Sequence, residues 1–138
     1  MWLLLAMLSA VSAAMVAIWG KMGVKDVDPA VATTVRAIVF VIILTLVTLT
    51  LGRFPQLAQI ENRTMKFLIL SGVAGAASWL FYFWALKLGE VDKVATIDRL
   101  SLVFVILLAA LLLGEKLTLY KIIGGVLVVG GAILITLF

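Results

Sequence analysis

Five long apolar runs limit the folds open to this chain more than any other feature of its sequence. They cover about residues 2–20, 29–51, 67–88, 94–113 and 118–138. A helix needs about 20 mainly apolar residues to cross the hydrocarbon of a membrane. The runs are continuously apolar, whereas strands of a membrane barrel alternate apolar and polar side chains over about ten residues. Since backbone polar groups in lipid must be paired within their own segment, we predict an all-α integral membrane protein with five transmembrane helices.

The overall composition agrees with lipid as the solvent. Hydrophobic residues make up 65% of the 138-residue chain and charged residues 13%, whereas soluble proteins have about 45–50% apolar and about 25% charged residues. A soluble fold needs polar side chains for much of its surface, and this chain has too few of them. We therefore expect one transmembrane domain over residues 1–138, with the lipid bilayer as a partner and no soluble domain.

The ionisable residues argue against several classes of function. The net charge is +4, but the basic residues are scattered singly and mostly flank apolar runs, so nucleic acid is not an expected partner. The chain has no cysteine and no histidine, which removes disulfides, most zinc sites and the commonest general base. Membrane enzymes normally use such groups, paired acids or a metal site. We expect no enzymatic activity, no catalytic residue, no metal and no cofactor.

The distribution of lysine and arginine hardly decides the orientation in the membrane. Five helices place the termini on opposite sides, and an excess of basic residues on one side sets the orientation. With the N-terminus inside, five basic residues face inward and four outward. Two alternatives remain: a single topology with a weak bias, or a dual topology in which the same chain inserts both ways and pairs antiparallel. The inner residues are Arg53, Arg63, Lys66, Lys116 and Lys121, and the outer ones are Lys21, Lys25, Lys87 and Lys93.

Three charged residues, Arg36, Asp98 and Arg99, fall inside predicted spans. A charge near the membrane centre costs about 2.5–3.5 kcal/mol on insertion scales, so it normally has a partner or faces a polar cavity. At a rise of about 1.5 Å per residue, Arg36 lies about 10 Å and Asp98 about 7 Å from the same membrane face. We therefore predict an Arg36–Asp98 ion pair, which either acts in function or only locks two helices together. Arg99 is turned about 100° away from Asp98 and can extend to the surface.

The third run carries a polar stripe and an aromatic cluster. The stripe follows steps of 4, 3 and 4 residues, which places its members on one helix face. Its members are Ser71, Gly75, Ser78 and Tyr82. The aromatic residues around Tyr82 either pack and anchor the helix or form the wall of a pocket for an organic molecule, and Trp19 has the same two interpretations. They are Trp79, Phe81, Phe83 and Trp84.

Glycines in the last run predict a surface for helix contact. Gly124 and Gly131 are seven residues apart, and Gly125 and Gly130 flank the same side. Small residues let helices approach closely, so we interpret this helix as a contact element and a candidate dimer seam.

Several segments resemble the EamA family of the drug/metabolite transporter superfamily. The most specific segment, with the paired glycines that follow it, looks like the closing signature of that family; it reads Gly114-Glu115-Lys116-Leu117-Thr118. The family's first two helices are similar to Trp19-Gly20-Lys21, Asp28-Pro29 and Arg36. Its third helix is similar to residues 78–88, which include Tyr82 and Ala85-Leu86-Lys87. The fourth helix of its short, single-domain members looks like residues 94–105, with Ile97-Asp98-Arg99-Leu100-Ser101.

The resemblance implies an architecture and a function. Typical members of the superfamily have ten helices in two five-helix repeats of opposite orientation, and this chain resembles one repeat. A single repeat obtains the same architecture only by inserting both ways, which requires a near-even count of basic residues on the two sides. The resemblance therefore implies an antiparallel homodimer, equivalent to a ten-helix transporter, that moves a small-molecule solute by alternating access. It also implies a multi-pass protein of the cell membrane, in a prokaryotic plasma membrane.

The resemblance also indicates which solutes and which residues to expect at the solute site. The related small multidrug resistance proteins use an acidic residue in the first helix, and residues 2–20 contain none, so proton-coupled export of drug cations is not expected. If Asp98 pairs with Arg36, the nearby positive charge keeps its carboxylate ionised, so it is a poor proton carrier. A zwitterionic or polar organic solute, such as an amino acid or an amine, could compete for that pair. The alternative is a nontransporting membrane component, or a half-transporter that needs a homologous partner. Candidate solute-binding or gating residues are Asp98, Arg36, Tyr82, Trp79, Ser78, Trp19 and Ser101.

Overall fold

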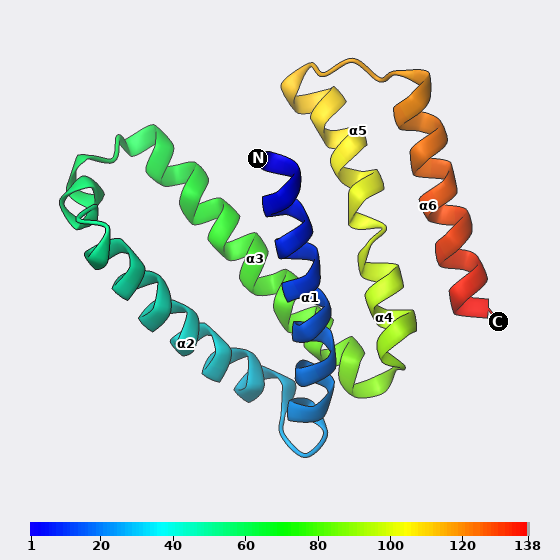
Figure 1. The fold of residues 1–138 in the computed structure, drawn as a ribbon, viewed down its shortest axis with the longest axis horizontal. Coiled ribbons are helices and arrows are strands. Elements are labelled where there is room, and N and C mark those ends of the chain that lie inside the picture. The colour runs from blue at the N-terminus through cyan, green and yellow to red at the C-terminus, as the bar shows by residue number, and fades with distance from the viewer. Residues whose placement is uncertain (138) are drawn as a thin grey trace. The chain divides into compact units, whose positions relative to one another are not determined.

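The computed structural model describes residues 1–137 and contains helices joined by short connections (Figure 1). The elements are α1 (Trp2–Val24), α2 (Pro29–Thr50), the 3₁₀ helix η1 (Phe54–Gln59), α3 (Asn62–Leu88), α4 (Val91–Asp98), α5 (Ser101–Leu113) and α6 (Leu119–Leu137). Within the described residues, five helical segments are long and apolar enough to cross a membrane, and α4 with α5 forms the fourth of them. The predicted all-α membrane fold is confirmed; residue 138, the predicted end of the last span, lies outside the described residues.

Two helices are longer than the apolar runs that predicted them. α1 continues to Val24, past Lys21, and α3 begins at Asn62, so that Arg63 and Lys66 lie in its first turns. Lysine and arginine are good helix formers, and their long side chains can carry the charge from a helix end to the membrane surface. The first charged residue therefore marks the end of the apolar segment rather than the end of the helix.

The fourth span is interrupted where a single helix over residues 94–113 was predicted. α4 ends at Asp98 and α5 begins at Ser101. Between them, the Leu100 N–H donates to the Ile97 carbonyl at 3.0 Å and the Leu102 N–H to the Arg99 carbonyl at 3.1 Å. These bonds span three residues instead of four, which is the pattern of a tight 3₁₀ turn. The fourth span is present as predicted, over Val91–Leu113, and the 3₁₀ turn inside it was not expected from the sequence.

The helix ends follow the expected local chemistry. Asp28 caps α2, because its Oδ1 accepts a hydrogen bond from the Ala30 N–H at 2.8 Å, and Pro29 occupies the first helical position, where no N–H is needed. Gly52 and Gly114 follow α2 and α5 with φ of +64° and +68°. A left-handed backbone of this kind favours glycine, which has no Cβ to clash with the following carbonyl.

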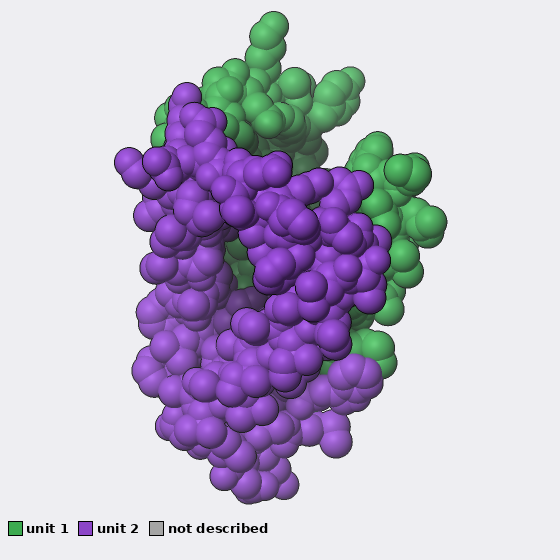
Figure 2. Space-filling view, turned by 90° about the vertical axis from the view of Figure 1, so that its left-hand side faces the viewer, with its two compact units in different colours: residues 1–18, 88–138 green, residues 19–87 purple. Residues whose placement is uncertain are grey.

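The contacts divide the chain into two compact units, coloured separately in Figure 2. Unit 1 comprises residues 1–18 and the chain from Leu88 onward, and in it α6 contacts both α4 and α5. Unit 2 comprises residues 19–87, with the end of α1, α2 and α3.

Few side chains are buried within this single chain. The buried apolar residues are Ala17, Val24, Phe83, Leu86 and Ala132. Most large apolar side chains of every long helix are exposed instead, as expected where lipid covers apolar surface that a soluble protein has to bury.

Candidate functional site

The charge of Arg36 lies among aromatic rings in unit 2. The guanidinium carbon is 4.2 Å from the ring centre of Trp79, 4.4 Å from that of Phe83 and 5.1 Å from that of Phe40. Arg36 and Phe40 are one turn apart on α2, and Trp79 and Phe83 are one turn apart on α3, so each helix presents its residues on one face. A cation over a ring face is stabilised by about 0.5–2 kcal/mol, with the larger values where water is excluded. We call Arg36, Phe40, Trp79 and Phe83 the arginine cage.

Tyr82 extends this cluster of rings. Its ring centre lies 5.7 Å from that of Trp79, with the two planes at 86°, and 6.2 Å from that of Phe83 at 64°. Edge-to-face pairs of this kind are favourable because the positive edge of one ring meets the negative face of another. The structure thus brings together Arg36, Trp79 and Tyr82, which the sequence singled out as site candidates.

One nitrogen of the caged guanidinium has no partner in the chain. Nη2 of Arg36 is buried and makes no hydrogen bond within residues 1–137. Leaving a charged donor buried without an acceptor is costly, and the ring faces compensate for charge without accepting a conventional hydrogen bond. A carboxylate from outside the chain would complete the site, because a guanidinium binds carboxylates with short, charge-assisted hydrogen bonds.

A close contact between α1 and α3 holds the Phe83 ring of the arginine cage in place. A Cβ placed on Gly20 would lie 3.1 Å from Cζ of Phe83 and 3.4 Å from Cδ1 of Leu86. The Lys21 ammonium donates to the Leu86 carbonyl, and the Lys87 ammonium donates to the Val27 carbonyl at 3.0 Å. Gly20 therefore lets the Phe83 ring reach its place beside Arg36. Lys21 ties the end of α1 to α3, and Lys87 ties the end of α3 to the connection between α1 and α2.

The remaining sequence candidates lie outside the arginine cage. Ser78 is exposed on α3, and Trp19 is 62% exposed near the end of α1. Asp98, half-buried, ends α4, and Ser101, exposed, begins α5. Because Asp98 belongs to unit 1 and Arg36 to unit 2, their ion pair stays a prediction.

The glycines of α6 are open within this chain. A Cβ placed on Gly124, Gly125, Gly130 or Gly131 would meet no heavy atom within 4 Å in the described part of the chain. Their small size is therefore not needed for packing against another helix of the same chain, and the predicted dimer seam stays a prediction.

The motif at residues 114–118 forms the connection between α5 and α6. Gly114 ends α5 in its left-handed conformation, and the Glu115 carboxylate pairs with the Lys121 ammonium at 2.9 Å. The Thr118 hydroxyl accepts a hydrogen bond from the Lys121 N–H at 3.3 Å, at the start of α6. Each of these three residues thus has a local structural task, which explains the residue types at this spacing.

Five membrane-spanning helical segments, with a caged charge in one of them, define a multi-pass membrane protein. The chain belongs to the EamA-like transporter family, whose model matches residues 1–137. It is 40% identical, over 137 residues, to an uncharacterized transporter in the cobO 3' region of a Sinorhizobium species, covering 99% of this chain and 97% of that relative. No solved structure matches the chain. The family resemblance seen in the sequence is confirmed.

Two contributors to the arginine cage were missed by the sequence analysis. Phe40 lies inside an apolar run and carries no signal beyond its position four residues after Arg36, which a search for ring partners of the charged residue could have used. Gly20 was noted only within the family resemblance. Its contact with Phe83 joins residues far apart in the sequence, so no local pattern reveals it.

Proposed function

We propose that this protein is a secondary transporter of a small organic metabolite, and that it works by alternating access as an antiparallel homodimer of chains inserted in both orientations. Family membership and a relative named as a transporter support transport. The five-to-four balance of basic residues and the odd number of spans support insertion both ways. Two oppositely oriented repeats around a site near the membrane midplane are a common basis of alternating access.

Our proposal for the class of solute rests on the arginine cage. Arg36 is held in a membrane-spanning helix with a buried donor that has no acceptor among residues 1–137. A zwitterionic or polar organic solute with a carboxylate would supply that acceptor, while Trp79 and Tyr82 line its path.

The open space beside the glycines of α6 is evidence for a contact with a second copy of the chain. The glycines of α6 leave room for close approach of another helix, and Gly124 and Gly130 are exposed. Packing between small residues is a main source of helix association in lipid, where the hydrophobic effect does not drive helices together. We place the dimer contact along the exposed side of α6, at Gly124 and Gly130.

Solute flux into liposomes tests the role of Arg36. The purified protein is reconstituted, and uptake of labelled amino acids and amines is compared for the natural chain, Arg36→Lys, Arg36→Gln and the control Arg53→Gln, which removes a charge from the exposed connection between α2 and α3. A hydrogen bond to a charged group contributes about 1.5–3 kcal/mol, so we expect Arg36→Gln to lower uptake by about tenfold or more. Arg36→Lys should retain part of it, since it keeps the charge but not the planar donors.

Two outcomes would count against the proposal. Uptake that is equal in the natural chain and in Arg36→Gln would remove the arginine cage from the transport path. If no solute is taken up by liposomes that hold the folded protein, and uptake appears only after a homologous chain is added, the protein is a half-transporter.

A further inference from the structure

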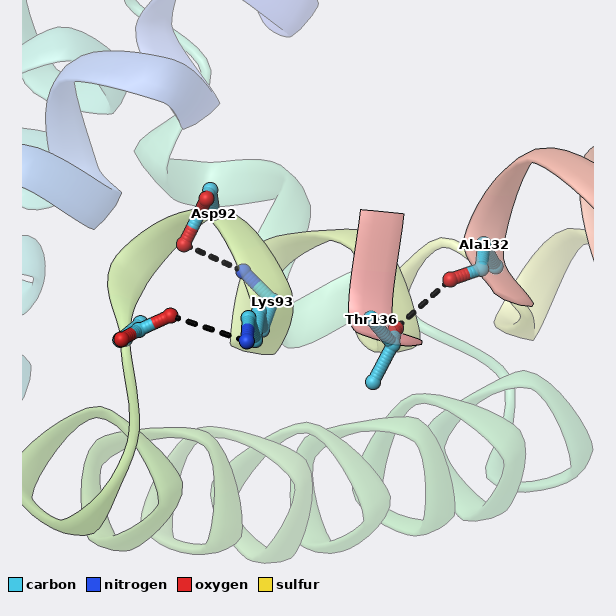
Figure 3. A network of polar contacts seen from close by, with 5 residues as sticks. Asp92, Lys93, Ala132 and Thr136 are labelled. Carbon is cyan, nitrogen blue, oxygen red and sulfur yellow. Dashed lines mark hydrogen bonds and ion pairs between the residues drawn. The ribbon is translucent and has the colours of Figure 1, made fainter. Parts of the chain in front are cut away.

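A largely apolar cavity with a few polar groups lies within unit 1, and none of its lining residues belongs to the arginine cage. It has a volume of about 730 Å³ and is lined by α1, α4 and α6. Two of its lining residues, Asp92 of α4 and Ala132 of α6, are labelled in Figure 3. Cavities of about 300–1,000 Å³ with a few placed polar groups are typical of small-molecule sites.

The polar groups of this cavity come from one face of α4. Asp92, Thr96 and Arg99 all line it, and their spacing of four and three residues places them on the same side of the helix. Arg99 stands where α4 gives way to the 3₁₀ turn that interrupts the fourth span. Asp92 and Arg99 are exposed and Thr96 is half-buried, so the cavity is open. Irregular backbone at membrane depth is tolerated where it lines a water-filled cavity.

These three side chains have spare bonding capacity. Oδ1 of Asp92 accepts a hydrogen bond from the Lys93 N–H at 2.8 Å (Figure 3). Within residues 1–137, its second carboxylate oxygen, the Thr96 hydroxyl and the Arg99 guanidinium make no hydrogen bond or ion pair.

The spacing of the two charges fits a compact molecule that carries both signs. Asp92 and Arg99 are seven residues apart, or about 10 Å along the helix axis. Helical side chains tilt toward the N-terminus of their helix, so an arginine at this spacing can reach back toward Asp92. A single small zwitterion can then place its ammonium on the aspartate and its carboxylate on the guanidinium.

The rest of the wall selects for an aliphatic body. α1 contributes four alanines, α6 contributes glycine, alanine and branched aliphatic side chains, and no aromatic ring lines the cavity among the described residues. Recognition by stacking or by cation–π contact, as in the arginine cage, is therefore absent from this wall. The short alanine side chains leave space beside α4 for a small aliphatic group.

We propose that unit 1 binds a small aliphatic amino acid, with its ammonium on Asp92, its carboxylate on Arg99 and the Thr96 hydroxyl bonded to the carboxylate. This inference rests on the proposed transport function and names its substrate class.

Equilibrium binding to the purified protein in detergent tests this site without requiring transport. The probes are L-valine, isobutylamine, which lacks the carboxylate of valine, and isovalerate, which lacks its ammonium. The variants are Asp92→Asn, Arg99→Gln and Thr96→Val, with Asp26→Asn and Arg53→Gln as charge-matched controls outside the cavity. Ala14→Leu fills the cavity from α1 and leaves all its charges in place. Circular dichroism and gel filtration verify that each variant is folded.

The natural chain should bind valine more tightly than either analogue. Asp92→Asn and Arg99→Gln should each weaken valine binding by about ten- to hundredfold, in line with the loss of one charged hydrogen-bond partner. Asp92→Asn should leave isovalerate binding nearly unchanged, and Arg99→Gln should do the same for isobutylamine. Ala14→Leu should weaken all three probes, while both controls bind as the natural chain does.

The outcomes separate this site from the proposed function. If folded protein does not bind valine, or if valine binds equally well to all cavity variants, the assignment of the cavity is overturned, even when liposomes take up another solute. Valine binding with the expected losses in Asp92→Asn and Arg99→Gln upholds the site, even if no flux is detected and the transport proposal fails.

Discussion

At the scale of single residues, Arg36 shows how a charge is accommodated in a membrane span. Three rings surround its guanidinium at 4.2–5.1 Å, and together they offset part of the cost of about 2.5–3.5 kcal/mol for such a charge. The position of one of these rings depends on a glycine, because the Phe83 ring packs against Gly20. A change at Gly20 should therefore affect both stability and the arginine cage.

Gly20→Val tests this dependence. Its branched side chain would collide with the Phe83 ring, and overpacking of this kind costs about 1–3 kcal/mol. We expect a loss of that size in the free energy of unfolding, measured by SDS titration in mixed micelles, together with slower solute uptake because the Phe83 ring is displaced from Arg36.

Gly23→Val is the matched control in the same helix. A Cβ on Gly23 would meet nothing within 4 Å, so stability should change by no more than about 0.5 kcal/mol, the difference in helix propensity. Equal losses in the two variants would show that the contact between Gly20 and Phe83 does not support the cage.

At the scale of helices, the connection after α5 needs a glycine for its backbone conformation, whereas Gly20 is needed for close packing. Gly114 ends α5 with φ of +68°, yet a Cβ placed on it would meet nothing within 4 Å. Its requirement is thus for backbone conformation and not for space. Gly72, inside α3, has the same open surroundings but no positive φ, so the pair separates the two effects.

Gly114→Ala and Gly72→Ala should change stability in opposite directions. Alanine in a left-handed conformation costs about 1–2 kcal/mol, whereas alanine for glycine inside a helix is favourable by about 0.5–1 kcal/mol. SDS titration should therefore show Gly114→Ala less stable and Gly72→Ala more stable than the natural chain. A neutral Gly114→Ala would contradict the role assigned to this helix end.

The helices also show what the sequence could and could not predict. The five spans follow from the length of the apolar runs, and the start of α2 follows from Asp28 and Pro29. The interruption after Asp98 has no such signal, because neither proline nor glycine stands at Arg99 or Leu100. Arg36 was predictable as a charge within lipid, but Phe40 and Gly20 act through contacts between or along helices that periodicity does not reveal.

At the scale of the whole molecule, the proposed dual topology requires one chain to provide both faces of the carrier. Five spans leave its two ends on opposite sides of the membrane. The numbers of basic residues facing each side differ by one in either orientation, so the energetic preference for one orientation is small. The proposed transporter therefore depends on the presence of both orientations in one membrane.

The absence of natural cysteines makes this claim directly measurable. Asp26→Cys places a thiol between α1 and α2, and Gln56→Cys places one in η1, on the opposite side of the membrane. Each variant is labelled in intact cells with a membrane-impermeant maleimide, and again after permeabilisation. We predict that each cysteine is labelled from outside in a comparable share of the chains, with the rest labelled only after permeabilisation; labelling of one cysteine from outside in all chains, and of the other in none, would contradict dual topology.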